Sequence, residues 1–328
     1  MITGTVLVTG ANGFIGKNIL THLMDAGFTI SATDIGDKSA IQGVSYQKAD
    51  ITCLDELEEA VDRESTVIHA AGLAHIFNDV HKKHELFRQI NEIGAANVAA
   101  AAAKKGAKHF ILISSVSVYG PFIHGLYAED APCQPVGPYA VSKYNAELRV
   151  AEIAEKTGMA LTILRLATLY GEGDPGNVGR LIRTLDKGRF IWIGDGSNRK
   201  SLLYKGDAAR ACVAVASSPA AGIRIYNVSA PPCTMREIVD GIADALGKRP
   251  LPLRISGKLS LALSRNLFRL PNPKLAGLHQ MIQKWIAEDV YDISWFERDY
   301  EFCAEIGIKE GLKREVAWYR NYRNPLIS

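Results

Sequence analysis

A glycine-rich stretch near the amino terminus constrains the fold of this chain more than any other feature. Residues 5–16 read TVLVTGANGFIG, an apolar run followed by Gly10, Gly13 and Gly16 at intervals of three. The next residues repeat apolar side chains at helical spacing until Gly27. Strand, glycine turn and helix in this order predict a dinucleotide-binding loop. One glycine permits the tight turn, one the approach of a pyrophosphate, and one the close packing of helix on strand.

An acidic residue follows the second predicted strand, which covers residues 28–33. This residue, Asp34, stands where an acid accepts hydrogen bonds from both ribose hydroxyls of an adenosine. It also repels a 2′-phosphate, because two unit charges ~4 Å apart cost about 1–4 kcal/mol in water or near a protein surface. We therefore expect NAD rather than NADP. The alternative is that Asp34 only starts a turn.

Strands and helices alternate through most of the chain, which predicts an α/β fold with a Rossmann-type doubly wound parallel sheet. The predicted strands cover residues 6–9, 28–33, 44–48, 66–69, 109–114, 160–166 and 223–228. The helices expected between them cover residues 17–26, 55–61, 86–105, a stretch from 139, and 207–216. The small residues Ala70, Ala71 and Gly72 follow the fourth strand and leave space for a ligand.

The pattern loosens after Tyr170. There we expect a helix at 180–185, a strand at 190–193, and a helix at 234–246 opened by a capping box of Thr234 and Glu237. We assign residues 1–168 to an NAD-binding domain whose core is completed by about 204–230. A smaller substrate-binding domain is then formed by residues 169–203 and 231–328.

Composition excludes several classes of protein. The formal net charge of +3 over 328 residues is too small to indicate a nucleic-acid partner. Five cysteines without a CxxC pair indicate reduced thiols, with no disulfide framework and no metal site. The first strand begins too early to leave room for a signal peptide, and no apolar run is as long as a membrane span. We expect a cytoplasmic protein.

One basic stretch stands apart, because the chain has no acidic residue between Asp244 and Glu288. Its basic residues are Lys248, Arg249, Arg254, Lys258, Arg265, Arg269, Lys274 and Lys284, and leucines at 259, 261, 263, 267 and 270 lie among them. A basic amphipathic stretch can lie on an anionic membrane surface. The alternative, which we favour at this point, is a helical cap on the substrate domain with a solvated basic face.

Tyr139 and Lys143 are the candidate catalytic pair. They lie four residues apart in a predicted helix, so they share one face. An ammonium group beside the phenol, and a positive nicotinamide nearby, favour the phenolate and lower a pKa that is normally about 10. The hydroxyl of Ser115, just after a strand, then hydrogen-bonds the substrate oxygen that exchanges the proton.

Several motifs in order now resemble one family, the extended short-chain dehydrogenase/reductases of the nucleotide-sugar epimerase/dehydratase group. The resemblance spans nearly the whole chain. The motifs are TGANGFIG at 9–16, Asp34, Asp50, HAAG at 69–72, Asn91, ISSVSVYG at 113–120, YAVSK at 139–143, RLATLYGEGD at 165–174 and IGIKEGLKREVAWY at 306–319.

The resemblance implies a role for each matching position. Tyr139 would be the acid/base, Lys143 its partner and a contact of the nicotinamide ribose, and Ser115 the catalytic hydroxyl. The implied NAD-binding residues are Gly10, Asn12, Gly13, Phe14, Ile15, Gly16, Asp34, Asp50, Ile51, Ala70, Ala71, Gly72, Asn91, Tyr139 and Lys143. The implied substrate-binding residues are His75, Ser115, Ser117, Thr168, Arg199 and Lys200. Asn91 on its own is equally compatible with an ordinary helix position.

The chain also departs from the family pattern. Members that eliminate water carry an Asp-Glu pair directly after the catalytic hydroxyl residue, and Val116 and Ser117 stand there instead. Thr168 replaces an Asn that UDP-galactose 4-epimerases use to contact the substrate. Where many members have an arginine for the nucleotide pyrophosphate, this chain has Arg199-Lys200. The first departure argues against a 4,6-dehydratase.

We therefore expect an NAD-dependent 4-epimerase that acts on a UDP-hexose or UDP-N-acetylhexosamine through a 4-keto intermediate. The alternatives are a nucleotide-sugar C4-keto reductase, a hydroxysteroid- or flavonol-type dehydrogenase, and a non-catalytic NAD-binding scaffold. Family members are often homodimers through a four-helix interface, which predicts a homodimer through the helices at 91–105 and from 139.

Overall fold

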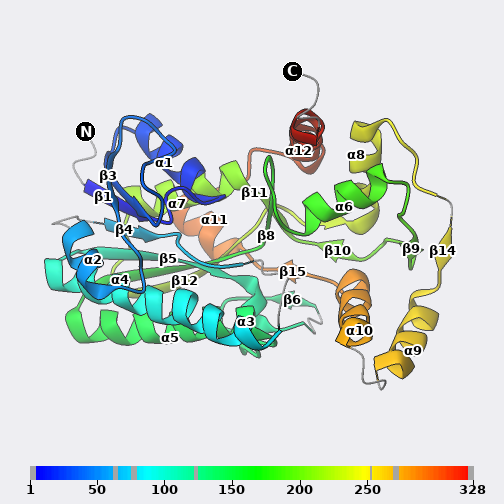
Figure 1. The fold of residues 1–328 in the computed structure, drawn as a ribbon, viewed down its shortest axis with the longest axis horizontal. Helices are drawn as coiled ribbons and strands as arrows, with labels where there is room; N and C mark the ends of the chain where they lie inside the picture. Colours follow the sequence, from blue (N-terminus) through cyan, green and yellow to red (C-terminus); the bar gives the residue numbers. More distant parts are fainter. Residues whose placement is uncertain are drawn as a thin grey trace.

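The computed structural model describes residues 5–61, 66–74, 80–121, 125–251, 253–268 and 273–323. Its centre is a parallel sheet in the order β12-β7-β5-β4-β1-β2-β3 (Figure 1). The bounds are β1 (Thr5–Thr9), β2 (Thr29–Asp34), β3 (Ser45–Lys48), β4 (Thr66–His69), β5 (His109–Ser115), β7 (Ala160–Leu166) and β12 (Ile223–Val228). Strand order reverses between β1 and β4, the point where such sheets bind ligands. The predicted doubly wound sheet is confirmed.

Helices cover both faces of the sheet, so its strands are buried apolar runs. One face is covered by α1 (Gly16–Asp25), α7 (Lys205–Ser217) and α11 (Ser294–Tyr300). The other is covered by α2 (Leu54–Ala60), α4 (Gly94–Lys105) and α5 (Pro138–Thr157). Leu7 points to the second face, whereas Val6 and Val8 point to the first. In α11, Phe296 is 1% exposed, so the chain beyond residue 231 also contributes to this core.

The single helix predicted at 86–105 is wrong. The structure has α3 (Val80–Phe87), a π-helical segment η1 (Arg88–Ile93), and then α4. Two consecutive polar side chains, Asn91 and Glu92, are buried in η1 and hydrogen-bond groups of the loop after β4 and of α5. These tertiary contacts explain the interruption, which helical periodicity in the sequence does not reveal.

A second apolar core is formed by eight elements that follow β7: β8 (Thr168–Tyr170), α6 (Asn177–Asp186), β9 (Trp192–Ile193), β11 (Leu202–Tyr204), β13 (Cys233–Thr234), α8 (Met235–Leu246), α10 (Pro273–Ile286) and α12 (Ile308–Arg323). The same part of the chain contains β10 (Arg199–Lys200), β14 (Arg254–Ile255), α9 (Gly257–Phe268) and β15 (Val290–Tyr291). The capping box of Thr234 and Glu237 is confirmed. The helix expected at 180–185 begins earlier, and the strand at 190–193 is shorter.

The long loop after β5 contains η2 (Val116–Tyr119), a short 3-10 helix, and β6 (Leu126–Tyr127). Strand β6 pairs in parallel with β15, so this loop is joined to the carboxyl-terminal part of the chain. Its position beyond the carboxyl end of β5 places it beside the region where a ligand of the sheet would lie (Figure 1).

Helix α12 is fixed to the loop after β8 by a buried carboxyl group. Glu315 is 2% exposed, and its Oε2 accepts a hydrogen bond from the backbone N–H of Gly171 at 2.9 Å. Burial, followed by the negative charge of Asp174, raises the pKa of Glu315 to about 9. The folded protein therefore holds Glu315 in its protonated form at neutral pH.

This raised pKa predicts a pH-dependent stability. Folding favours the protonated form, so its contribution is fully present below the ordinary pKa of 4.5 and is lost as pH rises toward about 9. We expect the wild type to lose free energy of unfolding relative to Glu315→Gln across this window, by up to about 1.4 kcal/mol per pH unit. Urea unfolding at several pH values measures it. Glu310→Gln, an exposed change on the same helix, should follow the wild type; parallel curves for Glu315→Gln and wild type would contradict the assignment.

Candidate active site

Two glycines of the first loop bring backbone segments into direct contact. Gly10 has a φ of +69°, and a Cβ on it would lie 2.4 Å from the backbone nitrogen of Ala71. A Cβ on Gly16 would lie 2.1 Å from the carbonyl oxygen of Gly10. The turn at Gly10, after β1, therefore lies directly against the segment that follows β4. Gly16 packs the start of α1 against the same turn. Gly13 is exposed in the turn that precedes α1, and its N–H donates to the carbonyl oxygen of Gly10 at 3.0 Å.

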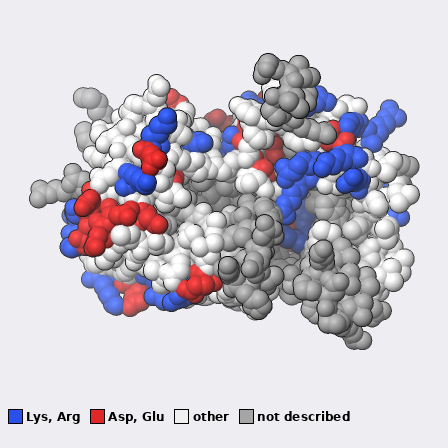
Figure 2. Space-filling view, in the orientation of Figure 1, with Lys and Arg blue, Asp and Glu red and all other residues white. Residues whose placement is uncertain are grey.

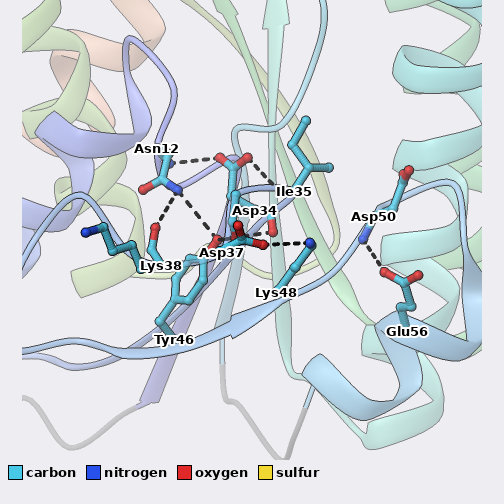
Figure 3. A network of polar contacts seen from close by, with 10 residues as sticks. Asn12, Asp34, Ile35, Asp37, Lys38, Tyr46, Lys48, Asp50 and Glu56 are labelled. Atoms are coloured by element: carbon cyan, nitrogen blue, oxygen red, sulfur yellow. Dashed lines mark hydrogen bonds and ion pairs between the residues drawn. The ribbon is translucent and has the colours of Figure 1, made fainter.

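Asp34 ends β2 beside this loop, and Figure 3 shows its carboxylate directed toward Asn12. Its Oδ2 accepts a hydrogen bond from the backbone N–H of Asn12 at 2.9 Å, and its Oδ1 accepts one from Ile35 at 2.7 Å. The Asn12 side chain donates to the carbonyl oxygen of Lys38 at 3.0 Å and accepts from Ala40 at 2.7 Å. The loop after β2 is thus tied to the glycine loop.

Further contacts hold the segment after β3, where the adenine was expected to lie. The backbone N–H of Asp50 donates to Glu56 of α2 at 2.8 Å, and Asn97 of α4 donates to the carbonyl oxygen of Ile51 at 3.1 Å. The sequence analysis did not single out Tyr46, whose hydroxyl donates to the carbonyl oxygen of Gly36 at 2.5 Å (Figure 3). These bonds fix the shape of the predicted adenosine end of the site.

The three predicted catalytic residues come together at the carboxyl end of β5. The Ser115 hydroxyl is close enough to the Tyr139 phenol to lower its pKa. The Lys143 ammonium donates to the carbonyl oxygen of Ile113 at 2.5 Å. A Cβ on Gly72 would lie 3.9 Å from Lys143 Nζ, so the small residue after β4 leaves room beside the lysine. The ring of Phe87 meets the Tyr139 ring edge-on, with centroids 5.9 Å apart.

The pKa of Tyr139 differs from our expectation. We expected the Lys143 ammonium to lower it, but in the structure the largest influence is burial, which raises the pKa above 10.0; the Ser115 hydrogen bond acts in the opposite direction. Burial also lowers the pKa of Lys143 to about 8, while Glu147 raises it. In the chain alone, Lys143 stays largely protonated at neutral pH and so remains a source of positive charge.

Helix α5, which carries Tyr139 and Lys143, is anchored by a buried ion pair. Arg165 Nη2 of β7 lies 2.8 Å from Glu147 Oε2, and both side chains are 4% exposed. The hydroxyl of Ser114 hydrogen-bonds the same carboxylate. Arg165 Nη1 also donates to the hydroxyl of Tyr119 at 2.9 Å. The sequence analysis missed this network, although glutamate at position 147 continues the four-residue spacing of 139 and 143.

Asn91 lies near the helix that carries Tyr139 and Lys143, and its side-chain amide makes its hydrogen bonds within the chain. It accepts a hydrogen bond from Leu73 N at 2.7 Å and donates to Leu73 O at 2.9 Å and to Ser142 Oγ at 3.0 Å. Ser142 in turn donates to the carbonyl oxygen of Tyr139 at 2.8 Å. Asn91 therefore positions the loop after β4 against α5, and a direct contact with a cofactor would compete with these bonds.

The predicted substrate-binding residues that the structure describes have different surroundings. Thr168 begins β8 and pairs with Leu202, and Ser117 Oγ is buried without a hydrogen-bond partner among the described residues. Lys200 Nζ lies 2.8 Å from Asp289 Oδ2, and Arg199 Nη2 lies 3.1 Å from Glu288 Oε2. A substrate contact by either cation would compete with these ion pairs. His75 lies outside the described residues.

Lys205 is a further residue that the sequence analysis missed. Its ammonium lies 5.6 Å from the ring centroid of Phe14, in the glycine loop, and 3.3 Å from the carboxylate of Glu172. It therefore links the glycine loop to the loop after β8. No signal in the sequence pairs these positions, because they are brought together only by the fold.

The loop geometry suits a dinucleotide. Glycines stand at the positions of the turn where a Cβ would clash, and Asp34 ends β2. Tyr139 lies beyond the carboxyl end of the sheet, where such folds bind their cofactor. Residues 6–229 match the family described as NAD dependent epimerase/dehydratase. The chain belongs to this family. NAD is the cofactor of the family, and the resemblance stated from the sequence is confirmed.

Individual relatives are similar over nearly the whole chain. An N-acetyl-α-D-glucosaminyl-diphospho-ditrans,octacis-undecaprenol 4-epimerase of Escherichia coli O157:H7 is 30% identical and covers 95% of this chain and 94% of its own length. A 2-alkyl-3-oxoalkanoate reductase of Stenotrophomonas maltophilia (strain K279a) is 29% identical, covering 94% of this chain and 97% of its own. The solved structure of MoeE5 in complex with UDP-glucuronic acid and NAD is 26% identical, with a TM-score of 0.78, and covers 97% of this chain and 100% of that one.

The contact between Gly16 and Gly10 predicts a sharp effect of a single methyl group. In Gly16→Ala the Cβ would overlap the Gly10 carbonyl oxygen, so the loop must shift. We expect NAD affinity, measured by calorimetry, to fall on the order of tenfold or more, because backbone N–H groups at a helix start bind the phosphates. Gly307→Ala, where a Cβ meets nothing within 4 Å, is the control and should bind like wild type. Equal affinity of the two variants would argue against this loop as the NAD site.

Proposed function

We propose that this protein is an NAD-dependent 4-epimerase of a nucleotide-linked hexose, a UDP-hexose or UDP-N-acetylhexosamine. The observation that carries the proposal is the grouping of Ser115, Tyr139 and Lys143 beside the carboxyl ends of β4 and β5. The relative from Escherichia coli named as a sugar 4-epimerase supports the reaction class. The bound UDP-sugar named for MoeE5 supports the substrate class.

The proposed mechanism uses the phenol of Tyr139 as acid and base. As phenolate it removes the proton of the C4 hydroxyl, and Ser115 hydrogen-bonds the same oxygen. NAD, when bound at the glycine loop, would supply the reversible hydride acceptor that oxidation and re-reduction at C4 require. Tyr139 then returns the proton, and no net oxidation occurs. Because burial alone favours the neutral phenol, the Ser115 hydrogen bond and the Lys143 charge are needed to stabilise the phenolate.

We assign the parts of NAD to residues of the first loop and of the strand ends beside it. Gly10, Gly13 and Gly16, with Asn12, Phe14 and Ile15, would hold the pyrophosphate. Asp34 would accept the adenosine ribose hydroxyls, and Asp50 and Ile51 would border the adenine. Ala70, Ala71 and Gly72 would leave room for the nicotinamide half, and Lys143 would bind its ribose.

A C4-keto reductase is the second candidate, because one similar relative is named as a reductase. The same three residues would serve it, but its cofactor must be exchanged after each turnover. Water elimination is disfavoured, because Val116 and Ser117 in η2 provide no carboxylate.

The two candidates differ in their need for reduced cofactor. With UDP-glucose, UDP-galactose and their N-acetyl forms, we expect epimerised product without added NADH. Tyr139→Phe should lower kcat by about 10²–10⁴, the usual contribution of a positioned acid/base, while NAD binding is kept. Tyr144→Phe, on the same helix, is the control. Turnover only with stoichiometric NADH would indicate the reductase, and full activity of Tyr139→Phe would refute the mechanism.

Asp34 is expected to decide between NAD and NADP. Removing its charge in Asp34→Asn removes repulsion of a 2′-phosphate worth about 1–4 kcal/mol near a surface. We expect the ratio of NAD to NADP affinity to fall on the order of tenfold. Asp37→Asn, a fully exposed carboxylate in the same loop that pairs with Lys48 at 2.8 Å, should leave the ratio unchanged. An unchanged ratio in Asp34→Asn would show that another residue discriminates between NAD and NADP.

We also propose that the protein is a cytoplasmic homodimer through the outer surfaces of α4 and α5. On α5, Leu148 is 53% exposed beside the charged residues Arg149 and Glu152, a mixture that suits an interface rim. The domain division at residue 168 likewise remains a proposal.

A further inference from the structure

The basic stretch between Asp244 and Glu288 folds with its apolar side chains outward. In α9, Leu259 is 54% exposed and Leu263 is 55% exposed, one turn apart. Among residues 257–265 of this helix, the buried positions are Ser260 and Ser264, at 7% and 2% exposure. This is the reverse of a helix that packs its leucines into a protein core.

The face of α9 that carries Ser264 packs against α10. The hydroxyl of Ser264 lies 2.7 Å from Nδ1 of His279 and donates to the carbonyl oxygen of Leu261 at 3.1 Å. Ser264 thus serves the contact between the two helices. Leu259 and Leu263 therefore stay accessible to a partner outside the chain.

More exposed apolar side chains lead into α9. Leu251 is 49% exposed, Leu253 is 56% exposed, and Ile255 of β14 is 38% exposed. We define the α9 surface as these three residues together with Leu259, Leu263, Arg254, Lys258 and Arg265. Five exposed apolar side chains within residues 251–263 are more than the scattered single exposures that need no explanation, and they indicate an interaction site.

Basic side chains accompany the leucines. Arg254, Lys258 and Arg265 are exposed and form no ion pair with an acidic side chain of the described residues. At about 100° per residue, Lys258 and Arg265 project about 20° apart and roughly 100–160° around the helix from Leu259 and Leu263, so the cations and the leucines occupy different exposed faces. A helix with exposed leucines on one face and cations on another is typical of segments that lie at the interface between the acyl chains and the headgroups of an anionic bilayer.

We propose that the α9 surface docks this protein on the surface of an anionic lipid bilayer. Figure 1 places β14 and α9 at the end of the molecule remote from α2. Figure 2 shows acidic side chains gathered over α2 and basic side chains gathered over the opposite half, near α6. This charge asymmetry would orient the protein with its basic end toward negative lipid headgroups. No helix among the described residues is long and apolar enough to cross the bilayer, so docking would be peripheral.

A second copy of the chain suits this surface less well. In a twofold dimer the same patch meets itself, so the arginines and the lysine of one copy would face those of the other. The sequence offers no acidic residue between 245 and 287 to neutralise them. Anionic lipid supplies the complementary charge that a second copy lacks.

Co-sedimentation of the full chain with vesicles tests the proposal. We expect binding at low salt to vesicles of equal parts phosphatidylcholine and phosphatidylglycerol, and little binding to phosphatidylcholine alone. Leu259→Ser/Leu263→Ser should weaken partitioning on the order of tenfold or more, because two leucines no longer enter the bilayer. Lys258→Glu/Arg265→Glu should weaken it on the order of tenfold or more as well, at roughly fivefold per lost charge.

The matched control is Met24→Ser/Leu54→Ser, which removes two exposed apolar side chains, 40% and 44% exposed, from α1 and α2. It should bind vesicles like wild type. The proposal is overturned if wild type does not bind anionic vesicles at low salt, or if the control loses binding as strongly as the leucine variant. It is also overturned if, without lipid, the leucine variant converts a wild-type dimer to monomers in ultracentrifugation, since the α9 surface would then be a self-interface.

Discussion

The buried ion pair between Glu147 and Arg165 is the interaction on which the arrangement of the active site depends. It joins α5 to β7, and it lies one helical turn beyond Lys143. Loss of one partner of such a pair leaves an unpaired buried charge, at a cost of about 3–5 kcal/mol. Because Tyr139, Lys143 and Glu147 follow one another along one face of α5, the pair fixes the rotation of that helix and with it the direction of the phenol.

Backbone contact supplies the second constraint. Gly10, Ala71 and Gly16 approach so closely that no side chain fits between them, and the ends of β1, β4 and α1 therefore meet at one place. This meeting point is the switch in strand order, where the cofactor of an open α/β sheet lies. The glycine loop and the tyrosine helix are thus held by different means, one by the absence of side chains and the other by a buried charge pair.

The sequence predicted what depends on local order. Apolar runs predicted the strands of the sheet, and the spacing of Gly10 and Gly16 predicted the turn and the helix contact. It did not predict pairings between distant polar residues, such as Glu147 with Arg165 or Lys205 with Glu172, because nothing in the chain order associates them. Nor could the basic stretch show that Leu259 and Leu263 face outward, since an amphipathic pattern has the same period whether its apolar side is covered or not.

The π-helical segment η1 has a consequence for comparing sequences in this family. One residue more or fewer between 88 and 93 would rotate α3 by roughly 100° relative to α4. Phe87 would then leave the edge of the Tyr139 ring, which it now meets at 5.9 Å. A one-position gap in an alignment here is therefore not a neutral difference in length, because it changes which side chain forms the wall beside the phenol.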